Sequence, residues 1–156
     1  MKKIFVILLA GFFSFAAKAQ TSRIISSRSL EEKLNEEYCT GLFKSTEGTI
    51  LDVASSNSAM AYLNILDWMQ GRVSGFQVYN NGYGTSIPLI RGSVPGIYLD
   101  EVPVSLNTLS LVNTNDIAIV KVIKTPFFGG FNSSGGAIAI YTWASDMEED
   151  EDHETK

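Results

Sequence analysis

The sequence predicts an α+β fold, in which a small mixed β-sheet is covered by two or more helices. Apolar residues recur at helical spacing in two segments of the first half of the chain, residues 29–42 and 58–70. After Gly71 the pattern changes to the period of two that is typical of strands. The run Ile117–Ile123 is so rich in β-branched residues that we expect burial on both faces of a sheet. Helices that precede strands in this way favour an α+β architecture.

The first predicted helix begins at Ser29. Ser29 and Glu32 have the spacing of a capping box, in which each side chain bonds the other residue's backbone N–H. Four apolar residues four positions apart form its buried stripe: Leu30, Leu34, Tyr38 and Leu42. Cys39 lies beside this stripe, where a lone thiol usually packs as a small hydrophobe.

The second predicted helix runs from about Ser58 to Gln70. Gly71 then suits the left-handed residue that often follows a helix. One face of the helix is apolar and carries Ala59, Tyr62, Leu63, Leu66 and Met69. Trp68 flanks that face and is expected at the edge of the core. The short apolar run 49–53 between the two helices fits either a strand or a loop.

Six strands are expected after Gly71, at residues 73–79, 87–91, 96–99, 102–104, 117–124 and 137–142. A turn at 80–84 joins the first two. Pro88 lacks an N–H, so its strand belongs at an edge or a bulge. Asp100 and Glu101 join the third strand to the fourth, and residues 106–111 fit one or two helical turns.

Both ends of the chain differ in composition from the rest. Lys2 and Lys3 precede an apolar run that ends at Ala17-Lys18-Ala19, so residues 1–19 are predicted to be a secretory signal peptide. Residues 146–156 hold seven acidic side chains and are expected to be disordered, either as a solvating terminus or as a docking or cation-binding tail. Between them we expect an N-terminal helix and linker at 20–57 and one domain at 58–145. The protein is then exported to the periplasm or the outer membrane.

Composition excludes several classes of function for this 156-residue chain. A formal net charge of -5 disfavours nucleic acid as a partner. One His and one Cys cannot supply a usual zinc site, and one Cys rules out an intramolecular disulfide. The single His, His153, lies in the acidic tail, so the predicted domain has no histidine base for a nucleophile. We therefore expect no enzyme activity, no catalytic residues, no metal and no cofactor.

Four blocks, in order along residues 65–142, resemble the plug domain of TonB-dependent outer-membrane receptors, especially the nutrient-receptor type common in Bacteroidetes. They are ILDWMQGRVSGFQV at 65–78, LIRG at 89–92, YLDEVPV at 98–104 and the segment 117–142. The sequence departs from the family pattern where Glu101 replaces the glycine of an Asp-Gly turn. Such a turn needs positive φ, which Glu adopts poorly, so the turn must change type or be strained. Two smaller departures, Lys124-Thr125-Pro126 and Thr142-Trp143, leave the expected fold intact.

The resemblance implies a plug without its barrel. A 22-stranded barrel needs at least ~200 residues at about 9–11 residues per strand, whereas fourteen residues follow Thr142. We therefore expect a stand-alone, exported, non-enzymatic binding or assembly component of the outer-membrane envelope, which serves nutrient uptake with a separate barrel or envelope protein as its partner. The alternatives are a free-standing periplasmic interaction module and an inactive receptor remnant. Residues 23–26 are the only candidate TonB box and match it weakly.

The resemblance also gives candidate contact residues. Arg91 matches the family's arginine that pairs with barrel carboxylates; alternatively it is a surface arginine that binds loop carbonyls. The apical loops correspond to residues 80–86 and 127–134. The aromatic residues in or beside them form either a contact rim or part of the core: Tyr79, Tyr83, Phe127, Phe128 and Phe131. Crosslinks from Lys121 or Lys124 to an outer-membrane barrel would support the first reading of the function.

Overall fold

The computed structural model describes residues 28–82, 85–129 and 133–143. The chain divides into two units between Lys33 and Leu34, and the second unit holds the sheet and the elements packed on it. The predicted signal peptide, the candidate TonB box and the acidic tail lie outside the described ranges. Within those ranges, no helix combines the length and the apolar character needed to cross a membrane.

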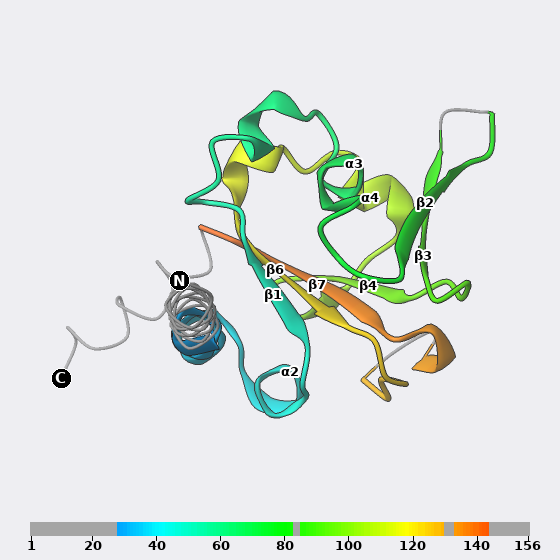
Figure 1. Cartoon of the computed structure of the whole chain (residues 1–156). Coiled ribbons are helices and arrows are strands. Elements are labelled where there is room, and N and C mark those ends of the chain that lie inside the picture. The colour runs from blue at the N-terminus through cyan, green and yellow to red at the C-terminus, as the bar shows by residue number, and fades with distance from the viewer. Residues whose placement is uncertain (1–27, 83–84, 130–132, 144–156) are drawn as a thin grey trace, which may run out of the picture. The chain divides into compact units, whose positions relative to one another are not determined.

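Five strands form one mixed sheet in the order β1-β6-β7-β4-β5 (Figure 1). Their bounds are Thr49–Asp52 for β1, Gly96–Leu99 for β4, Val102–Pro103 for β5, Ile117–Ile123 for β6 and Ala137–Thr142 for β7. β4 is parallel to β7, and the other neighbours are antiparallel. This arrangement confirms the predicted fold class. It also settles the open choice for the run 49–53, which adds an edge strand to β6.

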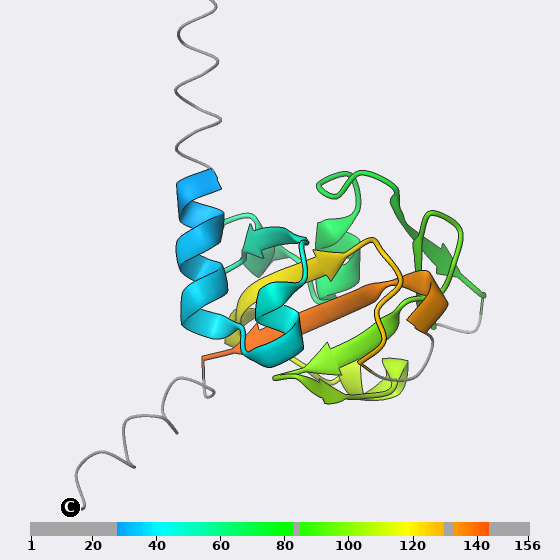
Figure 2. The same ribbon diagram turned by 90° about the horizontal axis from the view of Figure 1, so that it is seen from below.

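The sheet is covered on both faces, because side chains alternate along its central strands. Val120 and Val122 of β6 point to one hydrophobic cluster, whereas Ile119 and Ile123 point to the other. The first cluster is closed by η1 (Ala59–Ala61), α3 (Ile65–Met69) and α4 (Leu106–Leu109), and the second by residues 34–39 and α2 (Gly41–Ser45). Figures 1 and 2 show α3 and α4 across the sheet from α2. All seven residues of β6 are buried, as predicted.

A separate two-stranded antiparallel sheet consists of β2 (Phe76–Asn80) and β3 (Ser86–Ile90). It extends away from the five-stranded sheet beside α4 (Figure 1). Pro88 lies opposite Val78, and β3 has no second neighbour, so the predicted edge position of this proline is confirmed. Two short 3-10 helices, η2 (Thr114–Asp116) and η3 (Ser133–Gly135), precede β6 and β7.

The first helix differs from its prediction at both ends. Residue 28 is already helical, so Ser29 lies inside the helix and does not cap it. The helix ends at residue 38, and α2 begins only at Gly41. The break has a physical cause: the Thr40 N–H donates to the Glu101 carboxylate at 2.6 Å, and Thr40 is extended. A charged acceptor from the sheet thus replaces the helix carbonyl. Leu42, the last residue of the predicted stripe, is exposed.

The predicted helix 58–70 is two short helices. η1 ends at Ala61, and α3 begins at Ile65 after an extended Asn64, whose side-chain oxygen accepts from the Leu66 N–H at 2.9 Å. Asparagine caps helices well because its side chain replaces a missing backbone acceptor. The break turns Leu63 outward, where it is 99% exposed. Trp68 is buried in the first cluster, deeper than the edge position predicted for it.

Candidate functional site

Arg91 lies at the tip of a tight turn directly after β3. Residues Ile90 and Ser93 exchange both backbone hydrogen bonds, at 2.8 and 3.0 Å, and both Arg91 and Gly92 have positive φ. These features fit a type I′ turn. The Arg91 N–H also donates to the Gly75 carbonyl at 2.8 Å, which ties the turn to the loop before β2. The backbone therefore fixes the direction in which Arg91 leaves the fold.

The Arg91 guanidinium remains available for a partner. The side chain is exposed, and with the residues that the structure describes it makes no ion pair and no hydrogen bond. Within these residues the guanidinium does not donate to loop carbonyls, which were the alternative partners expected for Arg91. An exposed guanidinium with a fixed backbone can bind an external carboxylate through two parallel hydrogen bonds.

The predicted aromatic rim is divided by the structure. Tyr79 on β2 is 60% exposed and Phe128 is 84% exposed, so both are available for contact. Phe127 is only 2% exposed and packs its ring 4.7 Å from that of Phe43. Phe127 therefore fits the alternative in which these aromatic residues are part of the core, because its surface is buried in the second cluster. Tyr83 and Phe131 lie outside the described ranges.

Of the two lysines proposed for crosslinking, Lys121 is buried and Lys124 is not. Lys121 is 2% exposed in the middle of β6. Its ammonium donates to the Asn35 side-chain oxygen and to the Phe43 carbonyl. Burial lowers the pKa of this amine, since charge is costly away from water. Lys121 is thus a structural anchor and a poor crosslinking site, whereas Lys124 donates to the Ser74 hydroxyl at 3.0 Å near the surface.

The Asp100–Glu101 turn keeps the geometry of an Asp-Gly turn. Both residues have positive φ, 46° at Asp100 and 65° at Glu101, so the turn is strained and has not changed type. Each of the two carboxylates accepts hydrogen bonds from residues that are distant in the sequence. Asp100 accepts from the Thr142 N–H and hydroxyl at 2.8 and 2.9 Å. Glu101 accepts from the Thr40 N–H, the Thr40 hydroxyl and the Tyr141 hydroxyl.

Glu101 belongs to a partly buried polar cluster between the sheet and residues 34–45. Tyr141 donates to Glu101 at 3.0 Å and lies in the second cluster together with Cys39. Burial raises the pKa of both the Cys39 thiol and the Tyr141 phenol. Both groups are therefore neutral at pH 7, and Cys39 is not a reactive thiolate. Among residues 28–82, 85–129 and 133–143, no three His, Cys, Asp or Glu side chains are grouped to hold a metal ion.

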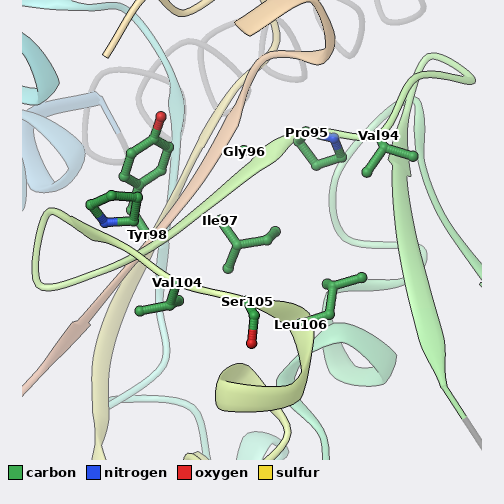
Figure 3. A pocket seen from close by; sticks show the side chains of 9 residues that line it. Val94, Pro95, Gly96, Ile97, Tyr98, Val104, Ser105 and Leu106 are labelled. Carbon is green, nitrogen blue, oxygen red and sulfur yellow. The ribbon is translucent and has the colours of Figure 1, made fainter. Parts of the chain in front are cut away.

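A mainly apolar cavity of about 400 Å³ lies where the chain leaves β5 and separates from β4. Figure 3 shows Ile97, Val104 and Leu106 around it, while the Tyr98 ring points away. Two of its lining residues are joined by a backbone bond, from the Val104 N–H to the Ile97 carbonyl at 2.9 Å. The sequence did not predict this cavity. It forms where two backbone segments separate, and its lining residues belong to no recognisable motif.

Comparison with known proteins gives likeness of fold alone. No family model matches the chain. No curated protein matches it either. The structure of the RagAB peptide importer in its closed-closed state is similar, with a TM-score of 0.51 and 24% identity over 63% of this chain and 12% of that one. A mutant of the ferric enterobactin receptor PfeA from Pseudomonas aeruginosa has a TM-score of 0.51 and 18% identity, over 61% of this chain and 17% of that one.

These similar structures are TonB-dependent receptors, named for import or reception and not for catalysis. The chain spans under a fifth of the length of either. The likeness that the four sequence blocks indicate is therefore confirmed at the level of the fold: this chain has a plug-like fold similar to that of TonB-dependent receptors.

Proposed function

We propose that this protein is an exported, non-enzymatic plug-like domain that binds an outer-membrane barrel protein and takes part in nutrient uptake through it. The observation that carries the proposal is the Arg91 turn, which presents a guanidinium without a partner among the described residues. The fold supports the same conclusion, since similar structures are named as a peptide importer and a ferric enterobactin receptor.

The proposed contact residues are Arg91, Tyr79 and Phe128. Tyr79 and Phe128 supply exposed aromatic area, and Arg91 supplies a bidentate donor for a carboxylate. Aromatic residues and arginine are the types that most often dominate binding energy at protein interfaces. A partner that carries acidic groups beside an apolar surface would therefore be complementary to these residues.

Site-specific photocrosslinking in intact cells tests this proposal. A benzophenone side chain replaces Tyr79 in one variant and Met60 in the control, since the two positions are 60% and 64% exposed on different elements. We expect ultraviolet light to give a crosslink to an outer-membrane barrel protein from position 79 and not from position 60. Arg91→Glu in the position-79 variant should lower the yield, and Arg91→Lys should restore part of it.

Other results would overturn the proposal. Equal crosslinking from both positions would indicate unspecific proximity. If position 79 gives no barrel product and the protein is released without detergent, the free-standing periplasmic module becomes the better interpretation. A folded protein with no crosslinks and no effect of Arg91→Glu would favour the inactive remnant.

A further inference from the structure

One backbone pair beside the cavity described above is only half formed. In an antiparallel ladder, the two residues of a hydrogen-bonded pair exchange both of their N–H···O bonds. The pairing of β4 with β5 ends at Tyr98 and Pro103. In the next pair, the Val104 N–H donates to the Ile97 carbonyl at 2.9 Å, but the reciprocal bond from the Ile97 N–H to the Val104 carbonyl is not formed. The two strands therefore leave one donor and one acceptor unpaired with each other where they separate.

The Ile97 N–H faces the side of β4 on which the cavity lies. Successive residues of a strand direct their N–H groups to opposite sides of the strand. The Gly96 N–H donates to the Gly136 carbonyl at 3.0 Å, on the side of β7. The Ile97 N–H therefore points the other way, to the side where the chain leaves β5. Ile97 is buried, and among the residues that the structure describes its N–H has no hydrogen-bond partner.

A buried backbone N–H without a partner is rare, because it has lost its bond to water and gained none in return. Water or a ligand normally supplies the missing acceptor. The cavity of about 400 Å³ would hold roughly a dozen water molecules, yet its mainly apolar lining offers them few hydrogen bonds. Apolar walls with a few polar groups are instead typical of small-molecule sites.

The lining restricts the chemistry of such a ligand. In the part of the chain that the structure describes, no charged side chain lines the cavity, so an ionised ligand would lose its hydration without gaining a counter-charge. Pro95 and Pro103 supply no N–H. The Ser105 hydroxyl is already engaged in the cap of α4, and Figure 3 shows it directed away from the cavity. The ligand is therefore uncharged, and its polar part is matched by the Ile97 N–H and the Val104 carbonyl.

We propose that this cavity binds an uncharged secondary amide held between apolar groups. The amide oxygen accepts from the Ile97 N–H, and the amide N–H donates to the Val104 carbonyl. The ligand thus bridges the two groups that the separation of the strands leaves unpaired. Its apolar groups pack against the side chains of Val94, Ile97 and Leu106, which Figure 3 shows around the space. This inference does not rest on the proposed function.

A series of matched ligands tests the amide. N-butylpentanamide carries an amide between two apolar groups, butyl pentanoate has the same length without the N–H, and pentanoate is charged at pH 7. Each is titrated into the isotope-labelled protein, and nuclear magnetic resonance follows the backbone amide of Ile97. We expect N-butylpentanamide to shift the Ile97 amide proton downfield until binding saturates. The ester should bind about tenfold more weakly, from the loss of one hydrogen bond, and pentanoate should not bind.

Val94→Phe and Val102→Phe form a matched pair of variants. Both valines are exposed, so each variant should fold, but Val94 lines the cavity and Val102 does not. Val94→Phe should weaken binding of N-butylpentanamide by about tenfold, because the larger side chain takes up part of the space. Val102→Phe should leave binding unchanged.

A blocked dipeptide distinguishes the two sources of such an amide. Acetyl-valyl-leucine methylamide carries it in an extended chain. Tighter binding of this probe than of N-butylpentanamide would identify the ligand as a chain segment, and weaker binding would identify it as a free small molecule; both results support amide recognition. The inference is overturned if amide and ester bind equally, if Val94→Phe has no effect, or if no probe shifts the Ile97 amide, which would leave the cavity to water.

Discussion

Replacing Glu101 by glycine tests whether the strained turn is stabilised by its side chain. Glycine is the second residue of an ordinary Asp-Gly turn, and it adopts positive φ freely. On backbone grounds alone, Glu101→Gly should therefore stabilise the protein by about 1–2 kcal/mol. The structure predicts the opposite sign, because the substitution also removes three hydrogen bonds made by the carboxylate.

The expected magnitude follows from these opposing effects. Three bonds at a half-buried carboxylate contribute about 1 kcal/mol each. The greater freedom of glycine in the unfolded chain costs about 0.5 kcal/mol more. After subtraction of the relieved strain, Glu101→Gly should lower the free energy of unfolding by about 2 kcal/mol, which corresponds to a fall in Tm of roughly 10 °C for a domain of this size.

Urea unfolding followed by circular dichroism measures this change. Glu101→Ala is the control, because it removes the same bonds but keeps a Cβ at positive φ. It should be less stable than Glu101→Gly by about 1 kcal/mol. If Glu101→Gly is as stable as the wild type or more stable, the carboxylate contacts do not offset the strain. The presence of Glu101 in place of the glycine of an Asp-Gly turn would then need another explanation.

Three further predictions concern the core and the pH dependence of stability. Phe127→Ala should destabilise by about 3–5 kcal/mol, whereas Phe128→Ala should stay within about 0.5 kcal/mol of the wild type, as measured by urea unfolding. Gly135→Ala should lower Tm sharply, because a Cβ there would lie 2.0 Å from a backbone oxygen of the segment before β4. Burial raises the pKa of Cys39 and of Tyr141 above their ordinary values of 9 and 10. Above those pH values the unfolded chain ionises first, because its groups keep the ordinary pKa. The stabilising contribution of each neutral group is therefore present below its ordinary pKa and is lost as the pH rises. Unfolding between pH 8 and 11 should show the loss, and Tyr141→Phe should reduce it above pH 10.

Elements with strong local signals were predictable from the sequence. The β-branched run of β6, the two-residue turn at Asp100 and Glu101, and the end of α3 before Gly71 all appear in the structure. Each depends on residues adjacent in sequence, so periodicity and turn chemistry were sufficient. Gly71 has φ of 81°, the left-handed conformation that its place after a helix suggested.

Hydrophobic periodicity did not predict the breaks in the two helices. At each break, a side-chain oxygen accepts a backbone N–H in place of a helix carbonyl. The acceptor that interrupts the first helix at Thr40 is Glu101, 61 residues away in sequence. The second helix is interrupted by a local cap at Asn64, a signal that was present but was outweighed by the apolar stripe around it. Hydrophobic periodicity therefore located the covering segments but overestimated their continuity.

The site was only partly predictable for a related reason. Lys121 lies in a strand predicted to be buried on both faces, so its burial was implied by the pattern, yet its charge suggested a surface position. The partners that make burial of Lys121 tolerable are Asn35 and the Phe43 carbonyl, which come from residues 34–45 and belong to no motif. Gly48 contributes as well, since a Cβ there would lie 3.1 Å from the Lys121 side chain.

The same reasoning explains why glutamate is acceptable at a turn position that glycine usually occupies. A glycine turn has little strain and no long-range contact. A glutamate turn has strain at one residue but links β5 to β7 and to the first turn of α2, through Tyr141 and Thr40. The link also supplies the anion that balances Lys121. The substitution thus exchanges an intrinsically relaxed turn for one whose conformation depends on Thr40 and Tyr141, so the stability of the turn is coupled to the packing of residues 34–45 on the sheet.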